Sequence, residues 1–158
     1  SEAAENALWQ VNYQAPIRLI KQVAERNCKI RLVQLSSLAA LCPHPYLAAY
    51  SASKAALQTY CLALQEEMRL KGSEMRVCLY ILGPVRTAIF PPELQNALGG
   101  SQLQMSPKIA ARRIIGLLQQ GRSYAIVGKR YRLLAWLMKL LPQRWIIRWI
   151  GAYLRKGL

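Results

Sequence analysis

The most constraining feature of this sequence is the segment from Met75 to Leu82, MRVCLYIL, in which nearly every residue is apolar. A strand with one side in solvent alternates apolar and polar residues, whereas this pattern is typical of a strand buried on both faces of a parallel sheet. Helices must then cover both faces of that sheet. The segment therefore predicts an α/β structure, and 158 residues are enough for one such domain.

The rest of the chain supplies the other elements of such a domain. Apolar residues at helical spacing predict helices over residues 5–25, 47–70, 107–120, 130–141 and 143–156. Two further strands are expected at Cys28–Leu35 and Tyr124–Val127. Pro16 indicates a bend or a late start in the first helix. The alternation predicts a partial Rossmann-like, doubly wound parallel sheet with flanking helices.

Charge divides the chain into two parts. The net charge is +15, all 7 acidic residues are Glu, and none follows Glu93. We expect residues 1–128 to form the sheet domain and residues 129–158 to form a tail of basic amphipathic helices.

In the last tail helix, one stripe carries Arg144, Arg148 and Arg155, and Ile146 and Ile150 point away from it. A basic stripe with tryptophan near its boundary favours peripheral contact with a membrane surface. Packing of the tail on the domain or on a partner subunit is the alternative. Nucleic-acid binding is disfavoured, because the large apolar residues of the tail would be exposed on a phosphate-binding surface.

The cysteines and the single histidine argue against a metal site. The 4 cysteines contain no CxxC pair, and a structural zinc site needs about four clustered Cys and His ligands. We expect free thiols in a reducing compartment, hence a cytoplasmic protein, with the tail at the cytoplasmic face of the membrane as a further possibility. No run reaches the roughly 18 apolar residues of a membrane span, and no signal-peptide pattern opens the chain.

Tyr50 and Lys54 are one turn apart in the longest predicted helix, so their side chains share a face. An ammonium group near a phenol favours the phenolate and lowers its pKa, which allows proton exchange with an alcohol near neutral pH. Ser37 ends the preceding strand and can donate a hydrogen bond to the same substrate oxygen. The pair alone is weak evidence, because most Tyr-x-x-x-Lys spacings lie on solvated helix faces.

Four segments, in order, resemble the short-chain dehydrogenase/reductase family. AAYSASKAAL (residues 48–57) is similar to the active-site helix with its YxxxK pair, and LSSLAA (residues 35–40) is similar to the serine motif. VNYQAP (residues 11–16) resembles the segment that carries an active-site asparagine, here Asn12. GPVRT (residues 83–87) resembles the segment that touches the nicotinamide half of the cofactor.

The resemblance covers about residues 5–127 and implies a role for each catalytic residue. Tyr50 would be the general acid/base, and Lys54 would lower its pKa and bind the nicotinamide ribose. Ser37 would polarise the substrate carbonyl, and Asn12 would hold a water that links Lys54 to solvent. The implied reaction interconverts a ketone and a secondary alcohol, with a hydrophobic or lipid-like substrate suggested by the tail.

The resemblance also implies a cofactor, NAD or NADP, with NADP preferred. The expected contacts to it are made by Tyr50, Lys54, Gly83, Val85 and Thr87. The glycine-rich TGxxxGxG turn of the family, which holds the pyrophosphate, is absent from this sequence. We therefore expect the catalytic, C-terminal portion of a longer enzyme that is a homo-oligomer at full length. The alternative is a truncated, non-catalytic remnant that serves as a membrane-surface or protein-interaction module.

Two other features lie near the expected site. His44 stands in a proline-rich loop, where packing of the loop is favoured over substrate contact. The loop over residues 83–105 contains a segment, Pro91–Leu103, that together with Met105 is expected to form either a substrate lid or an ordinary loop.

Overall fold

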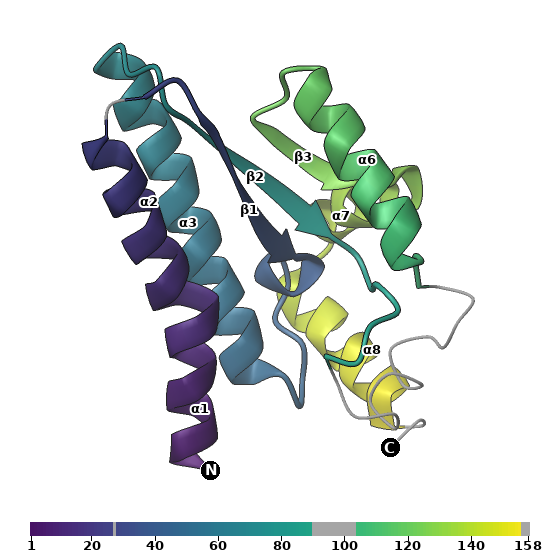
Figure 1. The fold of residues 1–158 in the computed structure, drawn as a ribbon. Helices are drawn as coiled ribbons and strands as arrows, with labels where there is room; N and C mark the ends of the chain where they lie inside the picture. The colour runs from purple at the N-terminus through teal and green to yellow at the C-terminus, as the bar shows by residue number, and fades with distance from the viewer. Residues whose placement is uncertain (27, 90–103, 156–158) are drawn as a thin grey trace.

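The computed structural model describes residues 1–26, 28–89 and 104–155, and within them three parallel strands form one sheet (Figure 1). The order across the sheet is β1 (Arg31–Ser37), β2 (Arg76–Leu82) and β3 (Tyr124–Val127). In β2, every residue from Val77 to Ile81 is buried. The prediction of a central strand covered on both faces is confirmed.

From Val77 to Tyr80, the side chains of β2 alternate between two apolar clusters, one on each face of the sheet. Val77 and Leu79 pack with residues of α2 (Ala15–Glu25) and α3 (Ala48–Leu70). Cys78 and Tyr80 pack on the other side, with residues of α6 (Pro107–Gln119) and α7 (Lys129–Leu140). Figure 1 shows α2 and α3 side by side on one face and α6 across the sheet from them. The expected partial Rossmann-like, doubly wound arrangement is confirmed.

The first predicted helix is interrupted at the position where Pro16 required a departure. Helix α1 (Glu2–Trp9) continues into a π-helical turn over Gln10–Gln14, and α2 follows with Pro16 in its first turn. Pro16 has no N–H and therefore cannot donate the α-helical hydrogen bond to the carbonyl of Asn12. The wider turn accommodates that missing bond, and Asn12 lies inside it.

Other boundaries differ little from expectation. β1 starts and ends later than the predicted Cys28–Leu35, because its ladder with β2 pairs Arg31 with Arg76 and Ser37 with Leu82. A 3₁₀ turn, η2 (Leu38–Ala40), follows it. The Ser106 side chain caps α6 as predicted, since its Oγ accepts a hydrogen bond from the Ile109 N–H at 3.3 Å.

Two expectations concern the loop after β2. The segment Pro91–Leu103, expected as a lid or an ordinary loop, lies outside the described residues. Met105 is buried in the core and forms an isolated bridge with Val85, so its position is that of a core residue.

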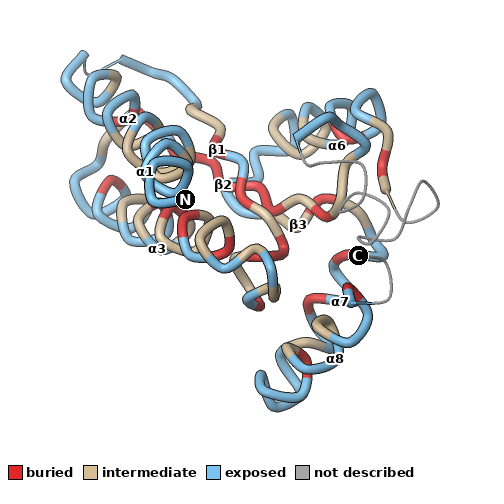
Figure 2. Tube along the Cα trace, turned by 90° about the horizontal axis from the view of Figure 1, so that it is seen from below, coloured by how far each residue is buried: buried red, intermediate tan, exposed pale blue. Residues whose placement is uncertain are grey.

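The tail helices α7 and α8 (Gln143–Arg155) are buried on one side only (Figure 2). Tyr131 and Ala135 of α7 join the core cluster of β2, and Ile146 and Leu154 are the buried residues of α8. The opposite sides carry exposed apolar and basic residues. The tail therefore packs on the sheet domain along one face and leaves a second face unpartnered within the described chain.

Candidate active site

A cavity of about 520 Å³ lies at the carboxyl ends of β1 and β2, which is the edge where parallel sheets bind ligands. Six of the seven predicted site residues line it: Ser37, Tyr50, Lys54, Gly83, Val85 and Thr87. These residues come from three separate segments of the sequence. Only the fold brings them to one cavity.

Tyr50 and Ser37 meet inside this cavity through their side chains. Ser37 belongs to the last ladder pair of β1, and its Oγ accepts a hydrogen bond from the Ala39 N–H at 3.2 Å. Burial raises the pKa of Tyr50 above its ordinary value, and the side-chain hydrogen bond with Ser37 lowers it by a smaller amount. The Tyr50 phenol therefore keeps its proton at neutral pH in this chain.

The direction of that pKa shift is opposite to the one expected from Lys54. The Lys54 ammonium donates a hydrogen bond to the Leu35 carbonyl at 3.2 Å and lies 5.9 Å from the centroid of the Tyr50 ring. It is therefore held by the backbone of β1, and burial has the larger influence on the phenol. Burial also lowers the pKa of Lys54 itself.

Asn12 does not line the cavity but is joined to the helix that does. Its side-chain amide donates a hydrogen bond to Ser53 Oγ at 3.3 Å, and Ser53 Oγ donates to the Tyr50 carbonyl at 2.8 Å. Ser53 is fully buried. Asn12 thus fixes α3 against the π-helical turn, and no pattern in the sequence singles out Ser53 as the link.

The segment after β2 presents its backbone to the cavity. Gly83 is packed so closely by Tyr131 that an added Cβ would lie 2.4 Å from its ring. The bridge between Val85 and Met105 uses the Pro84 carbonyl and the Arg86 N–H, so the N–H and carbonyl of Val85 point the other way. Val85 lines the cavity, and its carbonyl accepts a hydrogen bond from the Thr87 hydroxyl at 3.4 Å.

Tail residues complete the cavity wall, which the sequence reading did not anticipate. The wall includes Leu134 and Met138 of α7 and Ile150, Tyr153 and Leu154 of α8. The spacing of Ile146, Ile150 and Leu154 along one face of α8 was the available signal for a packed side. The basic charge of the tail favours a membrane surface and does not by itself predict this wall.

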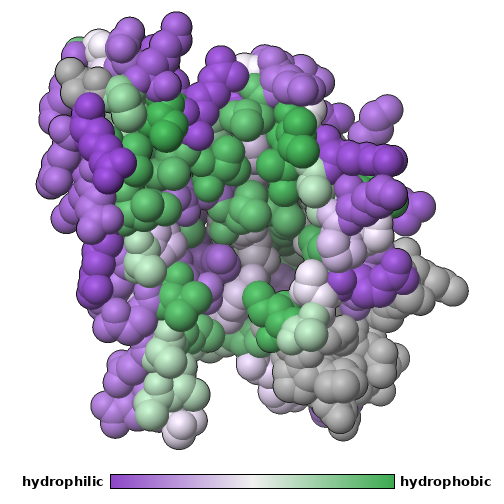
Figure 3. Space-filling view, viewed as in Figure 1, coloured by the Kyte–Doolittle hydropathy of each residue, from purple (hydrophilic) through white to green (hydrophobic). Residues whose placement is uncertain are grey.

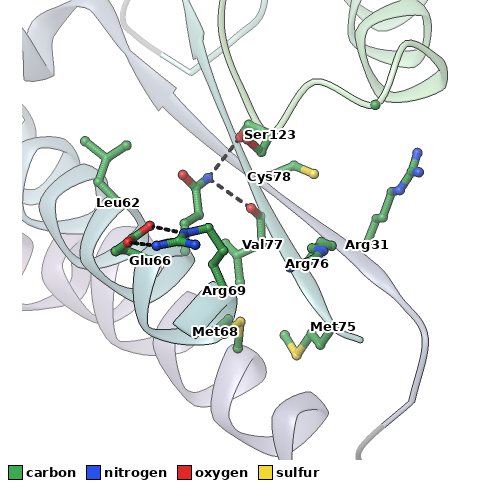
Figure 4. Close-up of a pocket in the computed structure, with 12 residues that line it drawn as sticks. Arg31, Leu62, Glu66, Met68, Arg69, Met75, Arg76, Val77, Cys78 and Ser123 are labelled. Atoms are coloured by element: carbon green, nitrogen blue, oxygen red, sulfur yellow. Dashed lines mark hydrogen bonds and ion pairs between the residues drawn. The ribbon is translucent and has the colours of Figure 1, made fainter. Parts of the chain in front are cut away.

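A second cavity of about 500 Å³ lies at the opposite end of the strands (Figure 4). There the Gln65 amide donates to the carbonyls of Val77 and Ser123, both at 2.9 Å, and Arg69 pairs with Glu66 at 2.6 Å. The Gln65 bonds hold α3 to β2 and to the residue before β3, whereas the pair of Arg69 and Glu66 lies within α3. The tyrosine, serine and lysine set of the first cavity has no counterpart among its lining residues.

The outer side of β1 has no partner strand among the described residues. Figure 3 shows hydrophobic surface across the middle of this face, between the α2–α3 layer and α6. Leu35 of β1 and the neighbouring Ile30 are exposed large apolar residues. The described sheet therefore ends at an apolar strand whose backbone can accept a further strand.

The sequence and the fold both match known proteins. A family model described as short chain dehydrogenase matches residues 1–97. The short-chain dehydrogenase ptmH of Penicillium ochrochloron is 28% identical to this chain, over 86% of the chain and 57% of that protein.

Solved structures share the fold at lower identity. A short chain dehydrogenase from Burkholderia cenocepacia in complex with NADP superposes with a TM-score of 0.69 at 20% identity, covering 88% of this chain and 56% of that one. A short chain dehydrogenase/reductase from Burkholderia phymatum in complex with NAD gives a TM-score of 0.59 at 19% identity, covering 73% and 49%. This chain therefore spans about half the length of the proteins it matches.

Proposed function

The chain belongs to the short-chain dehydrogenase family, and on that premise we propose that it carries the proton-transfer side of an NAD(P)-dependent oxidoreductase that interconverts a ketone and a secondary alcohol. The observation that carries the proposal is the hydrogen bond between Tyr50 and Ser37 in a cavity that Lys54 also lines. Both cofactor forms occur among the similar structures, so NAD and NADP are equally supported.

In the reducing direction, the Tyr50 hydroxyl donates its proton to the substrate oxygen as negative charge develops there. Its raised pKa keeps that proton in place at neutral pH until it is needed. Ser37 donates a second hydrogen bond to the same oxygen and stabilises the charge. When bound, the nicotinamide supplies or accepts the hydride, and Val85 and Thr87 are the residues that would hold it.

The reverse direction requires Tyr50 to act as a base. A closer approach of the Lys54 ammonium favours the phenolate and lowers the pKa of Tyr50. Lys54 is bound to the Leu35 carbonyl here, so that approach needs the ammonium to leave or share this bond. Asn12, through Ser53, fixes the helix on which both residues lie.

The test is to measure NAD(P)H oxidation with a panel of ketones, using the chain as given and the chain joined to the dinucleotide-binding half of a family relative. Tyr50→Phe removes the transferred proton and is expected to lower the rate by about 10²–10⁴-fold. Tyr46→Phe is the matched control, because Tyr46 is exposed and outside the cavity. A Tyr50→Phe variant with an unchanged rate would contradict the proposal.

The tail favours a second role, contact with an anionic membrane surface. Trp145, Trp149 and Tyr153 form an exposed row on α8, beside a stripe that contains Arg144 and Arg148. The described residues from 104 onward include no acidic residue that would compete for those charges. No helix among the described residues is long and apolar enough to cross a membrane, so the proposed contact is peripheral.

The same helices line the cavity, which supports a hydrophobic or lipid-like substrate. Leu134, Ile150 and Tyr153 belong both to the tail and to the cavity wall. Co-sedimentation with phosphatidylglycerol vesicles tests the contact. Replacing Trp145 and Trp149 by Ala together is expected to weaken binding, and Trp9→Ala in α1 is the control. Equal binding by all three proteins would rule out the proposed surface.

The non-catalytic module remains a candidate because the tail surface does not depend on a cofactor. Titration of the 158-residue chain with NADPH separates the two possibilities. Saturable binding at micromolar NADPH would remove the non-catalytic candidate. Vesicle binding without cofactor binding, and without turnover in the joined protein, would favour it.

A further inference from the structure

His44 is fixed between α3 and α8 at the rim of the candidate active site. Its backbone N–H donates to the side-chain oxygen of the buried Ser51 at 3.1 Å. Its ring Nδ1 lies 2.8 Å from the Cys42 carbonyl oxygen. The next residue, Pro45, is so close to α8 that a Cβ added at Gly151 would lie 3.3 Å from its ring. The backbone and ring of His44 and the following Pro45 are therefore all held in place.

The contact with Cys42 decides which ring nitrogen carries the proton. A carbonyl oxygen only accepts hydrogen bonds, so Nδ1 must be the donor and must be protonated. Burial lowers the pKa of His44, which keeps the ring neutral at physiological pH. In a neutral ring with a proton on Nδ1, Nε2 carries a lone pair and is a hydrogen-bond acceptor.

That acceptor has no partner within the described chain. No hydrogen bond of Nε2 to another described residue exists, and the buried side-chain atoms without a partner do not include it. The atom is therefore accessible rather than sealed in the core. His44 lines the same cavity as Ser37 and Tyr50, whose walls are otherwise largely apolar. A fixed acceptor on a largely apolar wall selects a ligand by the position of its donor.

The charges around the cavity restrict which donor fits. Lys54 lines the cavity, and neither Asp nor Glu is among its described lining residues. A protonated amine would meet the Lys54 ammonium without a compensating acid, which disfavours it. A carboxylate has no proton to donate to Nε2 of His44. An uncharged hydroxyl satisfies both conditions.

We propose that Nε2 of His44 accepts a hydrogen bond from a substrate hydroxyl other than the reacting oxygen, so that the substrate class is an apolar hydroxyketone. This assignment rests on the proposed function for the reacting oxygen, which Tyr50 and Ser37 hold. His44 is then a specificity residue that does not take part in proton or hydride transfer. In the reverse direction the substrate is the corresponding diol.

The chain allows a direct test, because His44 is its only histidine. In the chain labelled with ¹⁵N-histidine, NMR is expected to show one imidazole that is protonated on Nδ1 and unprotonated on Nε2 at neutral pH. The probes are 2-ketones of six to ten carbons and the same ketones with a hydroxyl on the terminal carbon. At least one hydroxyketone is expected to shift the Nε2 resonance and bind about three- to tenfold more tightly than its parent ketone.

The variant His44→Asn separates recognition from structure. Its amide nitrogen can keep the bond to the Cys42 carbonyl, but it has no atom at the position of Nε2. The preference for the hydroxyketone is expected to disappear while parent-ketone binding stays unchanged.

Three outcomes would overturn the proposal: a proton on Nε2 in the free chain, no Nε2 shift with any hydroxyketone, or a preference that persists in His44→Asn. The first two are measured on the unaltered chain, so they decide the question even where the variant does not fold. None of these measurements needs turnover. The oxidoreductase proposal is tested separately, by the rate of NAD(P)H oxidation in Tyr50→Phe.

Discussion

Helices α3 and α8 distribute their side chains in opposite ways. On α3, Ser51 and Ser53 are polar and only 2% and 0% exposed, whereas on α8 Trp145 and Trp149 are apolar and 68% and 81% exposed. Both arrangements reverse the usual preference of these residue types. The two helices differ in whether other residues of the fold offset the cost of the unusual placement.

The fold itself compensates the buried serines of α3. Ser51 Oγ accepts from the His44 N–H, and Ser53 Oγ bonds to both Asn12 and the Tyr50 carbonyl. Buried polar groups with such partners cost little and fix geometry. The exposed tryptophans of α8 gain nothing comparable from the described chain. The buried serines of α3 thus indicate a site within the fold, whereas the exposed tryptophans of α8 indicate contact with a partner.

The largest expected effect is a loss of stability when a buried side chain of α3 is removed, measured against removal of an exposed side chain of α8. Leu57→Ala removes a side chain that is 1% exposed and is expected to lower the free energy of unfolding by about 2–5 kcal/mol. Trp149→Ala removes a larger side chain and is expected to change it by less than about 0.5 kcal/mol. Urea denaturation followed by circular dichroism measures both. A comparable loss in Trp149→Ala would mean that the outer face of α8 belongs to the folded core.

A smaller effect is expected at the polar link inside α3. Ser53→Ala leaves the Asn12 amide without its acceptor and is expected to cost about 1–3 kcal/mol. Thr59→Ala, on the exposed side of the same helix, is the control and is expected to be nearly neutral. The same urea experiment applies. If the two variants are equally stable, the bond between Asn12 and Ser53 does not hold the π-helical turn to α3.

The smallest expected effect is on the pH dependence of stability. Burial holds the pKa of His44 below its ordinary 6.5, so between the two values the unfolded chain binds more protons than the folded chain. Stability is therefore expected to rise with pH across that window and to fall as the pH drops through it. Urea midpoints at about pH 7.5 and about pH 5 are expected to differ more in the unaltered chain than in His44→Asn. If the urea midpoint shifts equally in both proteins, protonation of the His44 ring does not affect the stability of the fold.

Much of the fold was predictable because it depends on local patterns. The continuous apolar run identified β2 as a central strand, and Ser106 and Pro107 marked the start of α6. The interruption at Pro16 was expected, but its form as a π-helical turn depends on the backbone of the whole helix. The ends of β1 were misplaced by a few residues, because a ladder register is set by the partner strand.

The site shows the same division. The spacing of Tyr50 and Lys54 and the position of Ser37 were sufficient to predict that they share a site, although their catalytic roles stay predictions. The direction of the Tyr50 pKa shift was not predictable, since it depends on burial and on Lys54 being held by the Leu35 carbonyl. The partners of His44 and Ser53 likewise come from distant segments.

The sequence by itself determined which residues can exchange protons and which strand must be central, because residue type and periodicity are local properties. Tertiary structure alone decided that α7 and α8 wall the cavity and that the half-buried phenol of Tyr50 meets Ser37. It also decided that Nε2 of His44 has no hydrogen-bond partner among the described residues. Those features depend on burial and on contacts between segments far apart in the chain. No single stretch of the sequence determines either the burial or the contacts.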